Sequence, residues 1–132
     1  MSPNSDSPII VQKFGGSSVA DAEKIKNVAR IIVNTYDKGY RTVAVISAMG
    51  DSTDDLVELA GNLCRNPGGR EYDALLATGE MVSVAAVALA INEMGYKAVS
   101  MNGQQAGIHT EDLHNRARIL EIKTENLINH LN

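Results

Sequence analysis

The sequence predicts an α/β fold, in which helices pack on a largely parallel β-sheet. Short apolar segments alternate with longer segments of helical periodicity, in the order strand, helix, strand, helix, helix, strand. The first two strand segments are almost continuously apolar, as expected of strands that are covered on both faces. The length of 132 residues suits one domain, and 44% of the residues are apolar, so the chain can build a core without disulfides or metal.

Two strand–helix units make up the first half of the chain. Residues 9–14 (IIVQKF) predict a strand that ends at a pair of glycines. Residues 19–37 carry apolar side chains at helical spacing, and Gly39 suits the end of that helix. Residues 42–47 predict a second buried strand, and residues 53–64 predict a helix with leucines on one face.

The second half begins at an Asn-Pro-Gly-Gly turn over 66–69. A short helix is predicted over 70–77 and a longer one over 80–94, with Gly79 between them. The longer helix is apolar on most faces, which is typical of a buried helix. Residues 97–101 predict a third strand. The remaining predicted elements are a hairpin between residues 108–110 and 117–122 and a helix capped by Thr124.

Composition and charge exclude several functions. Twelve basic against sixteen acidic residues and 4% aromatic residues oppose nucleic-acid binding. The longest apolar stretch, residues 84–91, is much shorter than the ~20 residues that span a bilayer. Residues 1–8 are polar and predict a disordered leader without signal-peptide features. The single cysteine, Cys64, is predicted to be a small core residue. A lone thiol is typical of a reducing compartment, so we expect a cytoplasmic protein without a membrane partner.

Loops that follow parallel strands meet at one sheet edge, where ligands bind. The first such loop contains Gly15 and Gly16, whose amides can form an anion-binding nest without an intervening Cβ. Ser17 adds a hydroxyl and Lys13 adds a positive charge, which together suit a transferring phosphoryl group. The loop matches neither Walker A nor G-x-G-x-x-G. The alternative, which composition alone favours, is a plain turn with Ser18 as the helix cap.

Two further loops carry polar residues. Residues 47–54 (SAMGDSTD) either hold a small polar substrate or simply provide a helix cap at Ser52 or Thr53. Glu80 is the first residue of the helix predicted over 80–94. Its carboxylate either binds a ligand ammonium group or complements the helix dipole. The polar loop at 102–107 is either a fourth contributor or a turn. The three histidines share no metal-ligand spacing, so no metal site is predicted.

Four short motifs stand in a characteristic order along the chain. They are Lys-Phe-Gly-Gly-Ser-Ser-Val at 13–19, Val-Ile-Ser-Ala-Met-Gly at 45–50, Thr-Gly-Glu at 78–80 and Gln-Ala-Gly-Ile at 105–108. This order resembles the aspartokinases of the amino-acid kinase family over nearly all of residues 9–123, with Ser17 where many members carry threonine. The resemblance implies a three-layer αβα sandwich with a mainly parallel sheet, of which residues 9–132 are the N-terminal, substrate-side portion.

The resemblance also implies an activity. Aspartokinases transfer a phosphoryl group from MgATP to the β-carboxylate of L-aspartate, giving 4-phospho-L-aspartate on the route to lysine, threonine and methionine. Lys13 resembles the catalytic lysine that stabilises the transferred group. The residues that resemble the phosphate loop are Gly15, Gly16 and Ser17, and those that resemble the aspartate pocket are Ser47, Thr53 and Glu80. Phosphoryl transfer depends on positioning and charge neutralisation, which these residue types supply.

Family members continue with segments that these 132 residues do not contain. These are a Gly-Arg-Gly-Gly-Ser-Asp-like segment, an arginine for the substrate α-carboxylate, the nucleotide-binding half and regulatory ACT modules. We therefore expect an incomplete kinase domain that forms a homo-oligomer or is completed by the rest of the kinase, with little activity alone. The alternatives are a non-catalytic binding or assembly module and an amino-acid kinase with another carboxylate substrate.

Overall fold

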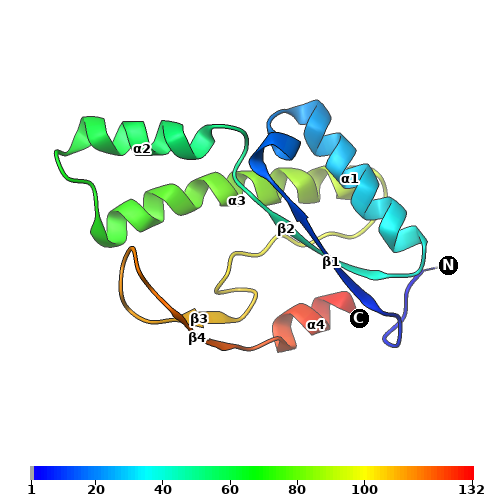
Figure 1. Cartoon of the computed structure of the whole chain (residues 1–132). Helices are drawn as coiled ribbons and strands as arrows, with labels where there is room; N and C mark the ends of the chain where they lie inside the picture. Colours follow the sequence, from blue (N-terminus) through cyan, green and yellow to red (C-terminus); the bar gives the residue numbers. More distant parts are fainter. Residues whose placement is uncertain (1) are drawn as a thin grey trace.

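Strands and helices alternate in the first half of the protein, and a hairpin and a short helix follow (Figure 1). The computed structural model describes residues 2–132. The elements are β1 (Ile9–Phe14), the 3-10 turn η1 (Gly16–Val19), α1 (Ala22–Asp37), β2 (Arg41–Ile46), α2 (Ser52–Leu63), α3 (Gly69–Glu93), β3 (Ile108–Thr110), β4 (Ile119–Ile122) and α4 (Glu125–Leu131).

The parallel pair β1–β2 is the centre of the fold. Its register runs from Ile9 opposite Arg41 to Phe14 opposite Ile46. Residues on the face of Phe14 and Ile46 pack against the core. The other face is exposed, with 65% of Val11 and 50% of Val45 accessible. Among the described residues, helices therefore cover only one face of this pair. The sheet and these helices form two of the three predicted layers.

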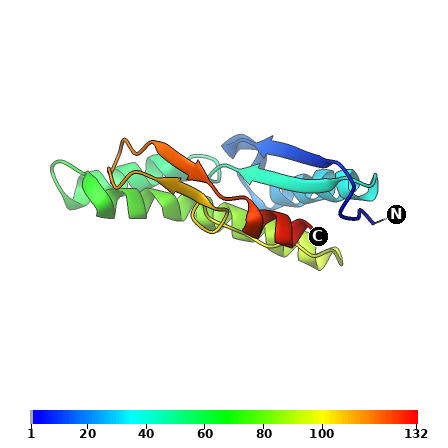
Figure 2. The same ribbon diagram turned by 90° about the horizontal axis from the view of Figure 1, so that it is seen from below.

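The core lies between this sheet face, α1 and α3. α1 buries residues at helical spacing, namely Ile25, Val28, Ala29, Ile32 and Val33. α3 adds Val87 and Ile91 and contacts α1, α2 and β2. Figure 2 shows the β1–β2 pair on one side of the molecule and α3 on the other. α3 thus holds the strand–helix units together.

The α/β class with a parallel sheet is confirmed, and so are the first two strands, the helix that follows each of them and the C-terminal hairpin. The prediction that both faces of these strands are covered is wrong, because the face of Val11 and Val45 is exposed. The first helix begins later than predicted because the Asp21 side chain caps it by accepting the Lys24 N–H at 2.9 Å. Residues 16–19 before it form the 3-10 turn η1.

The predicted break at Gly79 is wrong, because α3 is one continuous helix over Gly69–Glu93. Helix-forming residues flank Gly79 on both sides, and its missing side chain allows close packing against Ala48 and Leu56. By length and composition alone α3 could also cross a membrane, with a mean hydropathy of 2.0 over its most apolar window. Core helices pass the same test, and α3 contacts both α1 and α2. Only 22% of this window is buried, however, so the prediction of a buried helix is wrong.

The predicted third strand is also wrong, because residues 97–101 form neither strand nor helix. The Asn92 side chain accepts the Ala98 N–H at 2.8 Å and donates to the Ala98 carbonyl at 3.3 Å. Both backbone groups of Ala98 therefore bond to the end of α3. The prediction that Cys64 lies in the core is wrong as well: it is exposed just after α2.

The segment before β1 contains a hydrogen-bonded turn. The Asn4 N–H donates to the Ser7 hydroxyl at 3.0 Å, and the Ser7 N–H donates to the Asn4 carbonyl at 3.0 Å. Arg41 Nε donates to the Ser7 carbonyl at 2.9 Å. Residues 2–8 contain neither helix nor strand, and Met1 lies outside the described residues, so the disordered leader over 1–8 stays a prediction.

Candidate functional site

The loops that follow β1 and β2 are joined backbone to backbone. The Ser47 N–H donates to the Phe14 carbonyl at 3.0 Å, and the Gly50 N–H donates to the Gly16 carbonyl at 3.0 Å. These bonds continue the strand pairing beyond the ends of β1–β2. The structure therefore brings the first two predicted loops together at the carboxyl edge of the sheet.

The two glycines of the first loop face different surroundings. A Cβ at Gly16 would lie 2.9 Å from the Ala48 carbonyl oxygen and 3.1 Å from that of Gly50, so only glycine fits against this backbone. At Gly15 the nearest atom to an added Cβ is Lys13 Nζ, at 3.6 Å. The Lys13 ammonium group therefore lies beside the glycine loop, as the phosphate-loop hypothesis requires.

The alternative interpretation of the first loop fails in part. Ser18 does not cap α1, because Asp21 does, and the Ser18 N–H donates to the Gly15 carbonyl at 3.0 Å within η1. The side chains of Ser17 and Lys13 are exposed. A ligand can therefore reach the hydroxyl, the ammonium group and the glycine backbone of this loop from solvent.

The second loop leads directly into α2. Its N-cap position is Asp51, and no side chain caps the helix, so the cap interpretation of Ser52 and Thr53 is wrong. Ser47 is half-buried and Thr53 is exposed. The Ser52 Oγ is buried without a hydrogen-bond partner within residues 2–132, which marks it as an available polar atom.

The third candidate segment lies in the middle of α3 rather than at a helix start. Gly79 is buried, and a Cβ there would lie 3.3 Å from Ala48 Cβ and 3.3 Å from Leu56 Cδ1. This contact brings α3 against the second loop. Glu80 follows Gly79 and is exposed. Since α3 begins at Gly69, the dipole interpretation of Glu80 is wrong.

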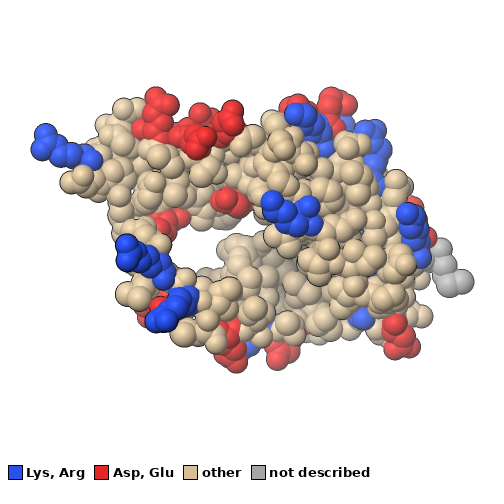
Figure 3. Space-filling view, viewed as in Figure 1, with Lys and Arg blue, Asp and Glu red and all other residues tan. Residues whose placement is uncertain are grey.

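A cavity of about 240 Å³ lies where the second loop, α2 and α3 meet. It is mostly apolar, and its lining residues are Met49, Ser52, Asp55, Leu56, Thr78, Gly79 and Val82. Figure 3 shows a separate opening on the other side of α3, between α3 and the β3–β4 hairpin, bordered by both acidic and basic side chains. None of the predicted substrate residues lines the cavity itself. Thr53 and Glu80 each follow a lining residue in the sequence, and Ser47 lies two positions before Met49.

Sequence reasoning missed three residues of this region: Ala48, Ser52 as an unpartnered hydroxyl, and Gly79 as a packing contact. The signal for Gly79 was present, because a glycine inside an otherwise helical apolar segment usually has a packing reason. No local signal identified Ala48, whose role depends on contacts with Gly16 and Gly79 from other elements.

The fourth loop bonds to itself. The Asn102 N–H donates to Gln105 Oε1 at 2.9 Å, and the Gln105 N–H donates to Asn102 Oδ1 at 2.8 Å. Gly107 has a φ of +88°, and a Cβ there would overlap the Lys123 carbonyl oxygen. These contacts favour the turn interpretation. In the part of the chain that the structure describes, no group of three potential metal ligands comes together.

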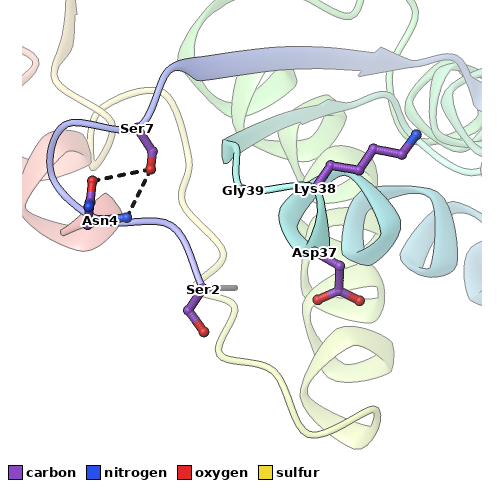
Figure 4. Close-up of a pocket in the computed structure, with 6 residues that line it drawn as sticks. All are labelled: Ser2, Asn4, Ser7, Asp37, Lys38 and Gly39. Carbon is purple, nitrogen blue, oxygen red and sulfur yellow. Dashed lines mark hydrogen bonds between the residues drawn. The ribbon is translucent and has the colours of Figure 1, made fainter.

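A larger cavity, about 410 Å³, lies at the opposite edge, beside the N-terminal turn and the end of α1 (Figure 4). Asn4 and Ser7, which line it, hydrogen-bond to each other. Lys38 points away from this pair in Figure 4. The polar groups of this cavity therefore do not converge on a ligand, and the carboxyl edge is the better candidate site.

Comparison with known proteins identifies close relatives. Residues 8–132 match the model of the amino acid kinase family. The chain is 53% identical over 116 residues to the aspartokinase of Geobacillus stearothermophilus, covering 88% of this chain and 28% of that protein. It is 50% identical over 123 residues to aspartokinase 2 of Bacillus subtilis, covering 93% of this chain and 30% of that protein. The sequence thus spans less than a third of each relative.

A solved structure supports the same assignment. The crystal structure of aspartate kinase from Synechocystis matches with a TM-score of 0.71 and 48% identity. The match covers 77% of this chain and 17% of that chain. The match shows that most of this chain shares its fold with part of a solved aspartate kinase.

Proposed function

The chain belongs to the amino acid kinase family, and we propose that it forms part of an aspartokinase, which phosphorylates the β-carboxylate of L-aspartate with MgATP. The juxtaposition at the carboxyl edge carries this proposal. Lys13 Nζ lies beside the glycine loop, and this loop is bonded to the one that begins with Ser47. The aspartokinase relatives support L-aspartate as the acceptor.

The residues of the first loop fit a nucleotide phosphate. Because Gly15 has no side chain, an anion can approach the backbone beside the Lys13 ammonium group. ATP, when bound, supplies the phosphoryl group, and Mg²⁺ would be bound mainly by the phosphates of ATP. Lys13 neutralises charge that develops during transfer, while the amides of Gly15 and Gly16 and the hydroxyl of Ser17 orient the phosphates.

The second loop and α3 hold the acceptor in this proposal. The hydroxyls of Ser47 and Thr53 bind aspartate oxygens, and the Glu80 carboxylate pairs with the α-ammonium group. Such charge-assisted contacts are short and directional, so they align the β-carboxylate with the phosphoryl group.

An assay of ADP release, with L-aspartate and MgATP and on the full polypeptide that carries this sequence, tests the proposal. We expect aspartate-dependent turnover that Lys13→Ala abolishes. L-Glutamate and N-acetylglutamate serve as competing acceptors, because preference for one of them would assign another amino-acid kinase. Absence of aspartate-dependent turnover, or full activity of Lys13→Ala, would contradict the assignment.

We also propose that a further polypeptide covers the exposed face of β1–β2, either a second copy in a homo-oligomer or the rest of the kinase. The exposed side chains there are Ile9, Val11 and Val45. The same face favours the assembly-module alternative, which calorimetric titration with ATP separates because that alternative predicts no heat. Light scattering checks the association. A cytoplasmic location is part of the proposal, supported by the exposed free thiol of Cys64.

A further inference from the structure

Three segments that are far apart in the sequence meet at Ala48. Its carbonyl oxygen faces Gly16 of the first loop, and its Cβ faces Gly79 of α3. Ala48 itself is 5% exposed. The first loop, the second loop and α3 therefore meet through two contacts of Ala48, one with Gly16 and one with Gly79.

Neither contact has room for another carbon atom. A Cβ at Gly16 would approach the Ala48 carbonyl oxygen to 2.9 Å, closer than real Cβ contacts. A Cβ at Gly79 would lie 3.3 Å from Ala48 Cβ and 3.3 Å from Leu56 Cδ1, tighter than ordinary van der Waals packing. The end of the Leu56 side chain can rotate away, whereas Ala48 has no side-chain torsion that moves its Cβ.

Ala48 also cannot withdraw as a whole. Its carbonyl oxygen already lies against Gly16. The Gly50 N–H also bonds to the Gly16 carbonyl at 3.0 Å, which fixes the second loop against the first. An added methyl group at Gly79 must therefore push α3 outward. Glu80 follows Gly79 in the same helix, so its backbone moves with this displacement.

We infer that Gly79 is a positioning residue, whose missing side chain sets the distance between Glu80 and the loop that carries Ser47. This inference rests on the proposed function, in which Glu80 and Ser47 contact the same aspartate molecule. Displacement of one partner weakens aspartate binding and misaligns its β-carboxylate. The Lys13 loop keeps its geometry, because the atoms nearest to an added Cβ at Gly79 belong to Ala48, Leu56 and Ser52 and not to that loop. The acceptor side is affected and the nucleotide side is not.

Gly79→Ala in the full polypeptide tests the inference. We expect kcat/KM for L-aspartate to fall by up to roughly tenfold, since a 1 Å misplacement costs about a hundredfold and the methyl group requires a smaller shift. The KM for ATP should stay within about twofold of the wild-type value, because the methyl group does not reach the first loop. The matched control is Gly61→Ala in α2, where an added Cβ meets nothing within 4 Å and both constants should stay unchanged.

A compensating variant separates positioning from general damage. Ala48→Gly removes the Cβ that the new methyl group meets, so Gly79→Ala/Ala48→Gly should recover most of the lost aspartate kcat/KM. If the wild-type protein phosphorylates L-aspartate and Gly79→Ala has the same kcat/KM, the inference is overturned and the proposed function stays intact. Equal losses for aspartate and ATP without recovery in the double variant would also overturn it. A wild-type protein without aspartate-dependent turnover would overturn the function and the inference together.

Discussion

At the amino end of the β1–β2 pair, polar side chains add hydrogen bonds to a backbone pairing that includes the bond from the Arg41 N–H to the Pro8 carbonyl. At the carboxyl end, within the described residues, the two loops are joined by backbone hydrogen bonds alone. Arg41 bonds to the Ser7 carbonyl and to Asn132, both at 2.9 Å, and the Tyr96 hydroxyl bonds to Asp37. At the carboxyl end, the bonds run between the backbones of the two loops, and the Lys13 side chain is exposed.

This difference is the one expected between a structural edge and the edge that we propose to be functional. Where side chains bond to each other, their donors and acceptors are used within the fold. Where the backbone alone fixes two loops, the side chains on them remain available to a ligand. The larger cavity lies at the amino edge, so cavity size alone would select the end of the sheet opposite to the proposed site.

Replacing one lysine at each edge tests the contrast most strongly. Lys13→Ala should lower aspartate-dependent kcat by about a hundredfold or more, because removal of one preorganised donor to a developing charge has an effect of this order. Lys38→Ala, at the amino-edge cavity, should leave kcat unchanged. Steady-state ADP release measures both. Equal losses for the two variants would remove the functional distinction between the edges.

Replacing each of the two adjacent glycines distinguishes packing from ligand access within the carboxyl edge. Gly16→Ala places a methyl group against two carbonyl oxygens and should destabilise the loop pair by about 1–3 kcal/mol. Gly15→Ala meets only the flexible end of Lys13, and its φ of −76° suits alanine, so stability should be kept while the KM for ATP rises.

Hydrogen exchange of the Ser47 and Gly50 amides, which bond to the first loop, measures the stability of the loop pair in both variants. Faster exchange in Gly16→Ala and unchanged exchange in Gly15→Ala is the expected result. The reverse pattern would show that the contact at Gly16 does not hold the loops together.

Local sequence patterns predicted the elements whose structure is decided locally. The apolar segments at 9–14 and 42–47 became β1 and β2, because short apolar segments bounded by glycine or polar residues suit strands. The pattern did not show that one face of this pair is exposed. Residues 97–101 have a similar pattern, yet the Asn92 side chain takes both backbone groups of Ala98. That contact depends on where the chain turns after α3, which no local pattern specifies.

The candidate site shows the same division. The rule that loops meet at the carboxyl edge of parallel strands correctly grouped the loops after β1 and β2. The predicted place of Glu80 at the start of a helix is wrong, because α3 continues through Gly79. A glycine suits this place inside α3 because Gly79 packs closely on Ala48, which lies 31 positions away in the sequence.

At the amino edge, Arg41→Ala should destabilise the protein modestly without changing its activity. It removes hydrogen bonds to the Ser7 carbonyl and to Asn132, and a typical net contribution is about 1 kcal/mol for each. Hydrogen exchange over residues 2–8 should accelerate, while kcat with L-aspartate stays the same. Arg30→Ala, at an exposed position on α1, is the control for loss of a positive charge. A fall in kcat with Arg41→Ala alone would contradict the separation of the two edges.

The smallest expected effect is a pH dependence of stability at the amino edge. The hydrogen bond that Tyr96 donates to Asp37 raises the pKa of the phenol above its ordinary value near 10. Below that pH, Tyr96 is protonated in both states and its stabilisation is complete. Above it, the unfolded chain loses the proton first, so this stabilisation is lost as the pH rises through the raised pKa of the folded protein.

Tyr96→Phe removes this hydrogen bond and its titration while keeping a ring that can pack against Tyr36, whose centroid lies 5.8 Å away. Thermal unfolding between pH 9 and about pH 11 compares the two proteins, with the other tyrosines titrating equally in both. The wild type should lose more stability than Tyr96→Phe over this range, and the kinase reaction at neutral pH should be the same. Parallel pH profiles would show that the Tyr96–Asp37 bond contributes nothing to the amino edge, whose order would then depend on Arg41.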